Sequence, residues 1–119
     1  MKEIPEKLFR ELADDLDVAV FITDADGTVH DLNEQASSIV RLPRITASGR
    51  NLARILPREV ADYLIGSGTD ALATGRIQRN AKLSMVLPGR GFRYFDVRVI
   101  PYRNSPGGPW LANVLLDIT

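Results

Sequence analysis

Two stretches of almost continuous apolar sequence, one near each end of the chain, constrain the fold most. Val18 to Thr23 reads VAVFIT, and Leu111 to Ile118 is nearly as apolar. A strand that is apolar on both faces belongs in the middle of a covered sheet, whereas an alternating strand can face water on one side. The two stretches are therefore predicted to be central, adjacent strands of one sheet.

The segment after the first strand has the pattern of a hairpin followed by a helix. Asp24 to Gly27 predicts a tight turn in which the glycine takes positive φ. Thr28 to Leu32 then forms a more polar second strand that pairs with the first. Asn33 suits the N-cap of a short helix that ends at about Val40.

Helical periodicity returns further along the chain. Residues 41–58 hold at most short helices, the clearest over Asn51 to Leu56. The spacing of Val60, Leu64, Gly68 and Leu72 predicts a long helix over Arg58 to Ala73, which the glycine at position 75 ends.

Alternating strands precede the final apolar strand. The first covers Ala81 to Leu87, and the second is centred on Phe95, Val97 and Val99. The strands that alternate belong outside the two apolar ones, which gives the order second, first, fifth, fourth, third. The fold class is α+β: a five-stranded antiparallel sheet with helices on one face.

The N-terminal segment forms a separate amphipathic helix over residues 5–16. Leu8, Leu12 and Leu16 recur at helical spacing, with Phe9 beside them. A helix of this length needs a surface to pack on. The chain is thus divided into residues 1–16, a capping or dimerisation helix, and residues 17–119, the domain proper.

The composition excludes several classes of protein. The 119 residues carry 15 basic and 15 acidic side chains, and this balance argues against nucleic-acid binding. Because there are no cysteines, the chain has no disulfide, thiolate metal site or cysteine nucleophile. No apolar run is long enough to span a membrane, and the N-terminus lacks the apolar core of a signal peptide. We therefore expect a cytoplasmic location.

Five local motifs, in order, resemble those of PAS domains. They are DVAVFITDADGTVHDLN over residues 17–33, GRNLARILP over 49–57, ALATG over 71–75, FRYFDVRVIPY over 92–102 and DIT over 117–119. The resemblance covers about residues 16–119. It implies a sensory module that acts in front of a histidine kinase, a cyclase or a transcriptional regulator.

The expected ligand pocket lies between the inner face of the sheet and the helices. Most of its candidate residues could equally be plain core, and the two asparagines could instead cap a helix or bond locally. The candidates are Phe21, Asn33, Leu52, Ile55, Leu64, Val97 and Asn113.

The sequence limits the cofactor without identifying it. His30 is the one histidine, and its place in a strand argues against haem, because the resemblance implies a ligand on the long helix. A flavin that forms a thiol adduct is excluded by the lack of cysteine. A non-covalent flavin held by Asn33 and Asn113, a small metabolite, or no ligand at all are left as alternatives.

The end of the chain has the clearest predicted role. By resemblance, Asp117, Ile118 and Thr119 form the exit toward an output domain that relays the signal. Thr119 could also cap a following helix, with Asp117 favourable at the positive end of that helix. The alternative is that the triplet is simply the end of a strand.

Two other residue pairs have competing interpretations. Gly66 and Gly68 each weaken the long helix, so either a ligand approaches the helix backbone closely, or the helix kinks or packs tightly on the sheet. Arg50 and Arg54 could bind an acidic ligand, but a solvated face explains them as well. No pattern of catalytic residues is found, so we expect no enzymatic activity.

Two functions follow from these predictions. The leading one is a ligand-responsive sensor that is joined to a C-terminal output domain. The other is a ligand-free interaction module. In both, the chain is expected to be a homodimer through Leu8, Phe9, Leu12 and Tyr94.

Overall fold

The sheet has the predicted strand order. The computed structural model describes residues 18–87, 89–104 and 106–119, and five antiparallel strands pair in the order β2-β1-β5-β4-β3. The two apolar strands at the chain's ends are neighbours, as predicted, with Phe21 opposite Asn113. The elements are β1 (Ala19–Thr23), β2 (Val29–Leu32), α2 (Glu34–Val40), α3 (Arg44–Ala47), α4 (Leu52–Ile55), α5 (Arg58–Thr74), β3 (Gln78–Leu87), β4 (Gly91–Tyr102) and β5 (Trp110–Asp117).

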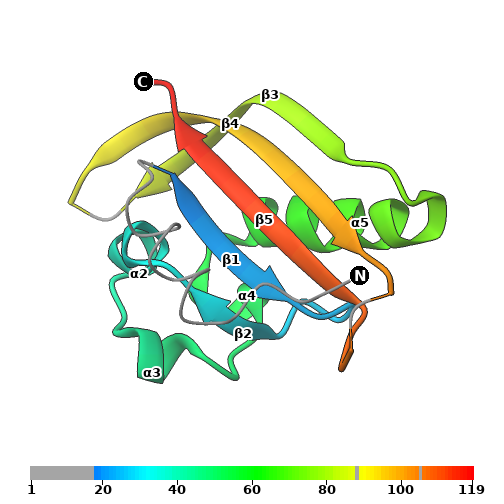
Figure 1. Cartoon of the computed structure of the whole chain (residues 1–119). Helices are drawn as coiled ribbons and strands as arrows, with labels where there is room; N and C mark the ends of the chain where they lie inside the picture. Colours follow the sequence, from blue (N-terminus) through cyan, green and yellow to red (C-terminus); the bar gives the residue numbers. More distant parts are fainter. Residues whose placement is uncertain (1–17, 88, 105) are drawn as a thin grey trace.

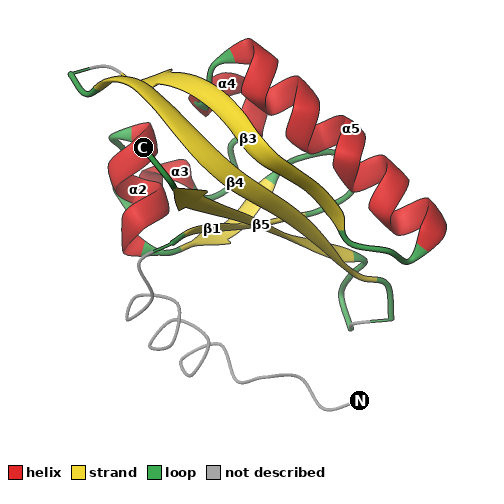
Figure 2. Ribbon diagram, turned by 90° about the horizontal axis from the view of Figure 1, so that it is seen from above, coloured by secondary structure: helices red, strands yellow, loops and turns green. Residues whose placement is uncertain are grey.

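The four described helices lie on one side of the sheet (Figures 1 and 2). The long helix α5 packs against β3 and β4, and α2 packs against β1 near the chain's C-terminal end. The helix predicted over residues 5–16 lies outside the described residues, so its packing stays a prediction.

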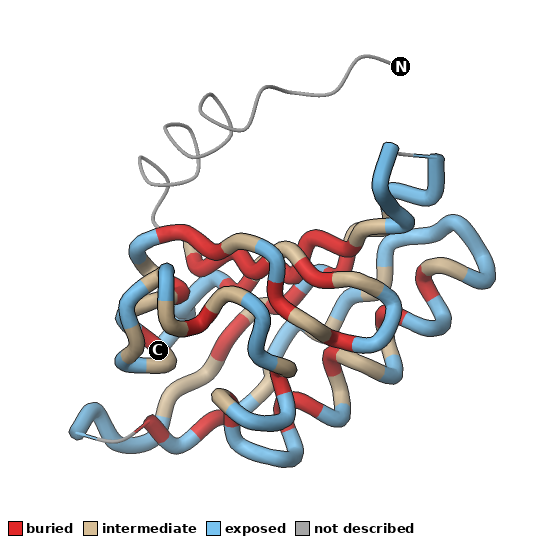
Figure 3. The backbone as a smooth tube through the Cα atoms, turned by 90° about the horizontal axis from the view of Figure 1, so that it is seen from below, coloured by how far each residue is buried: buried red, intermediate tan, exposed pale blue. Residues whose placement is uncertain are grey.

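A hydrophobic core lies between the sheet and the helices. Figure 3 shows where the buried residues fall along the backbone. Its largest fully buried apolar side chains come from β1, β2, α4, α5, β4 and β5, so every layer contributes to it. Burial of such side chains stabilises the fold by about 1.5–3 kcal/mol each. They include Phe21, Leu32, Leu52, Leu64, Val97 and Leu115.

The turn between β1 and β2 is organised by one carboxylate. Asp24 Oδ1 accepts hydrogen bonds from the amides of Asp26 at 2.9 Å and Thr28 at 3.1 Å. Gly27 has a φ of +88°, and an added Cβ would lie 2.8 Å from the side chain of Ile65. The turn therefore needs both the aspartate and the glycine.

Gly68 lets α5 approach the sheet closely, whereas Gly66 does not. A Cβ added at Gly68 would lie 2.6 Å from Leu111 Cδ1 on β5. At Gly66 an added Cβ would have no neighbour within 4 Å. Of the two readings of the glycine pair, tight packing of the helix on the sheet therefore explains Gly68.

Two elements extend beyond the sequence-based boundaries. The third strand was expected from Ala81, but β3 begins at Gln78, with a register shift between Asn80 and Leu83. The additional pairing brings Arg79 to Asp96 on β4, at 2.8 Å between Nη2 and Oδ2. The long helix ends one residue later than expected, at Thr74, and Gly75 takes the left-handed conformation with a φ of 72°.

None of the described helices is long and apolar enough to cross a membrane.

Candidate functional site

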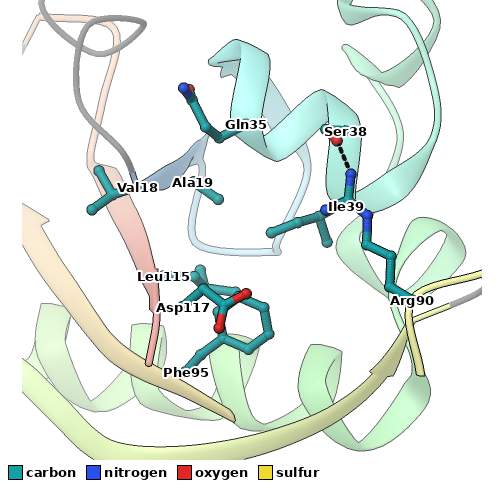
Figure 4. Close-up of a pocket in the computed structure, with 9 residues that line it drawn as sticks. All are labelled: Val18, Ala19, Gln35, Ser38, Ile39, Arg90, Phe95, Leu115 and Asp117. Carbon is teal, nitrogen blue, oxygen red and sulfur yellow. Dashed lines mark hydrogen bonds between the residues drawn. The ribbon is translucent and has the colours of Figure 1, made fainter. Parts of the chain in front are cut away.

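A cavity of about 150 Å³ opens between α2 and the neighbouring ends of β1 and β5 (Figure 4). Its walls combine an apolar set with four polar side chains. The apolar set is Val18, Ala19, Ile39, Phe95 and Leu115, and the polar set is Gln35, Ser38, Arg90 and Asp117.

Asn33 holds the helical wall of this cavity in place. Its Oδ1 accepts from the amides of Ala36 at 3.0 Å and Val20 at 2.9 Å. Its Nδ2 donates to Val18 O at 2.7 Å. One buried side chain therefore caps α2, as predicted, and also ties the start of that helix to β1. Ile39, about one and a half turns from the start of α2, is then buried among the core residues.

The mouth of the cavity is bordered by a cation and an anion. Arg90, in the turn between β3 and β4, donates from Nη2 to Ser38 Oγ on α2. Asp117, at the end of β5, lies 3.7 Å from the guanidinium of Arg93, measured from Oδ2 to Nη1. Both charged groups therefore already have a partner within the protein.

The pKa of Asp117 lies below its ordinary value. Burial alone would raise the pKa, but hydrogen bonds from the amide and hydroxyl of Thr119 and the charges of Arg93 and Arg90 outweigh it. The carboxylate is consequently ionised near neutral pH and presents a negative charge at the cavity.

The residues that follow the cavity wall are bonded to β4. We call Asp117, Ile118 and Thr119 the terminal triplet. The Thr119 amide donates to Asp117 Oδ1 at 2.9 Å, and Thr119 Oγ1 accepts from the Tyr94 amide at 2.9 Å. The Ile118 amide donates to Tyr94 O at 2.9 Å. The end of β5 is thus fixed to β4 by two direct bonds and one internal bond.

The seven predicted pocket residues do not line this cavity. Phe21, Leu52, Leu64 and Val97 are each 0–1% exposed and belong to the hydrophobic core, while Ile55 is half-buried against it. Asn33 borders a shallow second depression beside Glu34, Ser37 and Arg44. Their contact with a ligand stays a prediction.

Asn113 is a buried polar side chain on the inner face of β5. Its Nδ2 donates to Phe21 O at 3.1 Å and to Thr23 Oγ1 at 3.0 Å. Among the described residues, no donor bonds to its Oδ1. Leaving such an oxygen buried and unbonded costs about 1–3 kcal/mol.

The predicted dimer residues can be placed only in part. Leu8, Phe9 and Leu12 lie outside the described residues. Tyr94 lies on the outer face of the sheet, where its ring packs edge-on against Phe92 and beneath the ammonium of Lys82, 4.6 Å from the ring centroid.

The remaining candidates have local explanations. His30 is exposed, lies 3.2 Å from Asp24 Oδ2 and packs edge-on against Trp110. The side chain of Arg50 donates to Thr46 O at 3.0 Å, in the preceding helix α3. Within the described part of the chain, no three His, Asp or Glu side chains gather as metal ligands would.

Sequence reasoning missed most of the cavity residues. It singled out Asp117 only for signal relay, and it did not select Ser38 or Arg90, which are 52 positions apart and meet only in the folded chain. Neither residue belongs to a motif with a chemical meaning of its own. The one usable signal was the glycine-rich turn that carries Arg90 beside the end of the sheet.

Comparison with known proteins identifies the family. The sequence profile of the PAS fold matches residues 13–119. The chain belongs to the PAS fold family. Among curated protein sequences, none is a match to this chain.

Solved structures share the fold at low sequence identity. A sensory box sensor histidine kinase from Vibrio cholerae is 28% identical, with a TM-score of 0.67 over 95% of this chain and 90% of that one. The PAS domain of the RpfR quorum-sensing receptor from Cronobacter turicensis, solved in complex with BDSF, is 17% identical, with a TM-score of 0.68 over 88% and 97%.

A third similar structure is a larger protein. VqmA of Vibrio cholerae, described as a dimer in work on LuxR-type receptors, is 17% identical, with a TM-score of 0.75. The match covers 95% of this chain and 49% of VqmA.

Proposed function

We propose that this PAS domain is the sensory module of a larger signalling protein. A small ligand enters the cavity between α2 and β5, and the terminal triplet relays its presence to a C-terminal output domain. A histidine kinase or a transcriptional regulator is the output that we favour, because similar structures come from a sensor histidine kinase and a LuxR-type receptor.

One observation carries this proposal. Asp117 lines the cavity and is also the first residue of the terminal triplet. A ligand that contacts its carboxylate competes with Thr119 and Arg93 for the same oxygens. Binding therefore acts directly on the bond between Asp117 and Thr119, and through Thr119 on the hydrogen bonds that fix the end of β5 to β4. A ligand shifts an equilibrium only through such differential contacts.

The comparisons support a ligand-binding role at the level of the fold. The PAS domain of RpfR was solved with BDSF and also with C12:0. A domain of this architecture can therefore hold a ligand. We assign no cofactor, and a non-covalent flavin held by Asn33 and Asn113 stays a prediction, as do the lack of catalysis and the cytoplasmic location.

Native mass spectrometry after incubation with a small-metabolite extract tests ligand binding. The wild-type chain should retain an adduct. Ala19→Leu, which places a larger side chain in the cavity, should lose the adduct. Ala73→Leu makes the same change at an exposed position of α5 and should keep it. An adduct that Ala19→Leu retains, or no adduct on any of the three proteins, would contradict a sensor that uses this cavity.

A ligand-free dimerisation module is the second candidate. Supporting it, the outer sheet face carries exposed apolar side chains from β3, β4 and β5, namely Val86, Phe92 and Leu116, and Ile118, which follows β5, is also exposed. Such a patch is typical of an interaction surface.

Sedimentation velocity tests the predicted homodimer. Leu8→Ser with Leu12→Ser should give monomers, and so should Phe92→Ser with Tyr94→Ser. Unchanged dimers in both double variants would exclude this face and the N-terminal segment as the interface.

A further inference from the structure

The chemistry of the cavity indicates which class of ligand it takes, and this inference rests on the proposed function. The floor is apolar, because Ile39 comes from α2, Phe95 from β4 and Leu115 from β5. All three are less than 10% exposed. A ligand therefore needs an apolar part to occupy this space favourably.

Opposite charges border the same opening without pairing with each other. Figure 4 shows Arg90 turned toward Ser38, while the carboxylate of Asp117 lies beside the ring of Phe95. Within the described residues, no ion pair of 4.0 Å or less joins Arg90 to Asp117. The arginine is nevertheless close enough to help lower the pKa of the carboxyl. The two charges are thus separated by a gap that a ligand can bridge.

A ligand that carries a single charge fits this arrangement poorly. A simple anion at Arg90 meets repulsion from Asp117, and a simple cation at Asp117 meets repulsion from Arg90 and Arg93. A molecule that carries both charges satisfies both ends at once, and charge-assisted hydrogen bonds are the strong ones. The order of charges is also fixed, since the anionic end must face the arginine.

We propose that the cavity binds a small zwitterion with an apolar side chain, of the class of free aliphatic α-amino acids. The ligand carboxylate bonds to Arg90, the ammonium bonds to Asp117, and the side chain packs on Ile39, Phe95 and Leu115. The size of the apolar part agrees, because a cavity of about 150 Å³ holds a molecule comparable to benzene, which is larger than an aliphatic side chain, while both charged groups of the ligand lie at the mouth.

An NMR titration of the isotope-labelled chain with L-leucine tests this assignment. Leucine should give saturable shifts of the backbone amides of Ala19, Ile39 and Leu115. Two analogues keep the apolar chain and remove one charge each: 4-methylpentanoate lacks the ammonium, and 3-methylbutylamine lacks the carboxylate. Each analogue should bind at least about tenfold more weakly than leucine.

Variants that remove the charge of Arg90 or of Asp117 then test which end of the ligand each residue binds. Arg90→Gln and Asp117→Asn should each weaken leucine binding by roughly tenfold to a hundredfold. Arg90→Gln should bind 3-methylbutylamine no more weakly than the wild type does. Asp117→Asn should bind 4-methylpentanoate no more weakly than the wild type does. A general loss of structure would weaken both analogues together, so this crossed pattern separates recognition from folding.

The exposed pair on α5 supplies matched controls. Arg58 and Asp62 are 94% and 67% exposed and do not line the cavity. Arg58→Gln and Asp62→Asn make the same changes of charge and should leave the affinity for leucine unchanged.

Two outcomes would contradict the proposal that the ligand is a zwitterion. If 4-methylpentanoate bound as tightly as leucine, the ligand would be a monoanion and the sensor proposal would stand. If none of the three compounds gave saturable shifts at these amides, the ligand class would be wrong. The proposed function itself is tested separately by native mass spectrometry, where an adduct that Ala19→Leu retains, or no adduct on any of the three proteins, would contradict it.

Discussion

Thr119 Oγ1 accepts a hydrogen bond from the backbone amide of Tyr94 at 2.9 Å, so the side chain of one residue continues the pairing of β5 with β4 beyond the last strand residue. In the same place, the Ile118 amide donates to the carbonyl of Tyr94. The terminal triplet is therefore a defined structure, and it shares Asp117 with the cavity.

The hydroxyl of Thr119 should protect the Tyr94 amide from exchange with solvent. Thr119→Val keeps the shape of the side chain and removes the acceptor, so exchange at Tyr94 should accelerate about fivefold, which corresponds to roughly 1 kcal/mol. Hydrogen exchange followed by NMR measures this rate. Thr119→Ser keeps the hydroxyl and should exchange like the wild type, and equal rates in all three proteins would show that the bond is not formed in solution.

Replacing Asn33 should destabilise the domain more than replacing the other asparagine cap. Asn33→Ala removes the cap of α2 and leaves the buried Val20 amide without its acceptor, so unfolding should become easier by about 2–4 kcal/mol. Asn51→Ala removes an exposed cap from α4 and should cost about 1 kcal/mol. Urea denaturation measures both, and equal losses would contradict the tie between α2 and β1.

The two glycines of α5 should respond oppositely to alanine. Gly66→Ala meets open space and should stabilise the domain by about 0.5–1 kcal/mol, because alanine favours the helix. Gly68→Ala forces Leu111 or the helix to move and should destabilise the domain by about 1–2 kcal/mol. Thermal unfolding of the two single variants measures both stability changes. If the two variants were equally stable, α5 would not be closely packed on β5 at Gly68.

Asp24 should make stability depend on pH below neutrality. Burial alone would raise the pKa of this carboxyl, but the hydrogen bonds from His30 and from the Thr28 and Asp26 amides outweigh it and hold the pKa below its ordinary value. A carboxyl with a lowered pKa stabilises the folded state above the unfolded pKa of about 4, and this contribution is lost as the pH falls through the lower, folded value.

Asp24→Asn isolates that contribution, because an asparagine Oδ1 can still accept from the two turn amides. The wild type should exceed the variant in unfolding free energy at pH 7, and the difference should shrink as the pH falls from 5 toward 3. A difference that does not change with pH would show that the charge of Asp24 contributes nothing to stability. Urea denaturation at each pH supplies the comparison.

The fold could be predicted from local patterns, because each pattern has a local physical cause. Continuous apolar residues in Val18–Thr23 mark a central strand, and Gly27 and Gly75 mark chain reversals that require positive φ. The start of β3 was missed because Gln78 and Arg79 are polar. Their place in the sheet depends on pairing with β4 and on the ion pair to Asp96.

The cavity could not be predicted from the sequence, and Asp117, one of the residues that line it, was predicted only for a role in signal relay. Ser38 and Arg90 acquire their meaning from a contact across the folded domain, and no spacing in the sequence records it. The predicted pocket residues such as Phe21 and Leu64 share the inner face of the fold, but apolar residues that fill a core and those that line a pocket have the same pattern in sequence.

Coupling between the cavity and the terminal triplet is the central claim, and hydrogen exchange at the amides of Tyr94 and Ile118 tests it most directly. In Ala19→Leu, which fills the cavity, both amides should exchange at rates at least about threefold different from the wild type, while Ala73→Leu should leave them unchanged. Unchanged rates at both amides in Ala19→Leu, with the variant folded, would contradict a relay from this cavity to the end of β5.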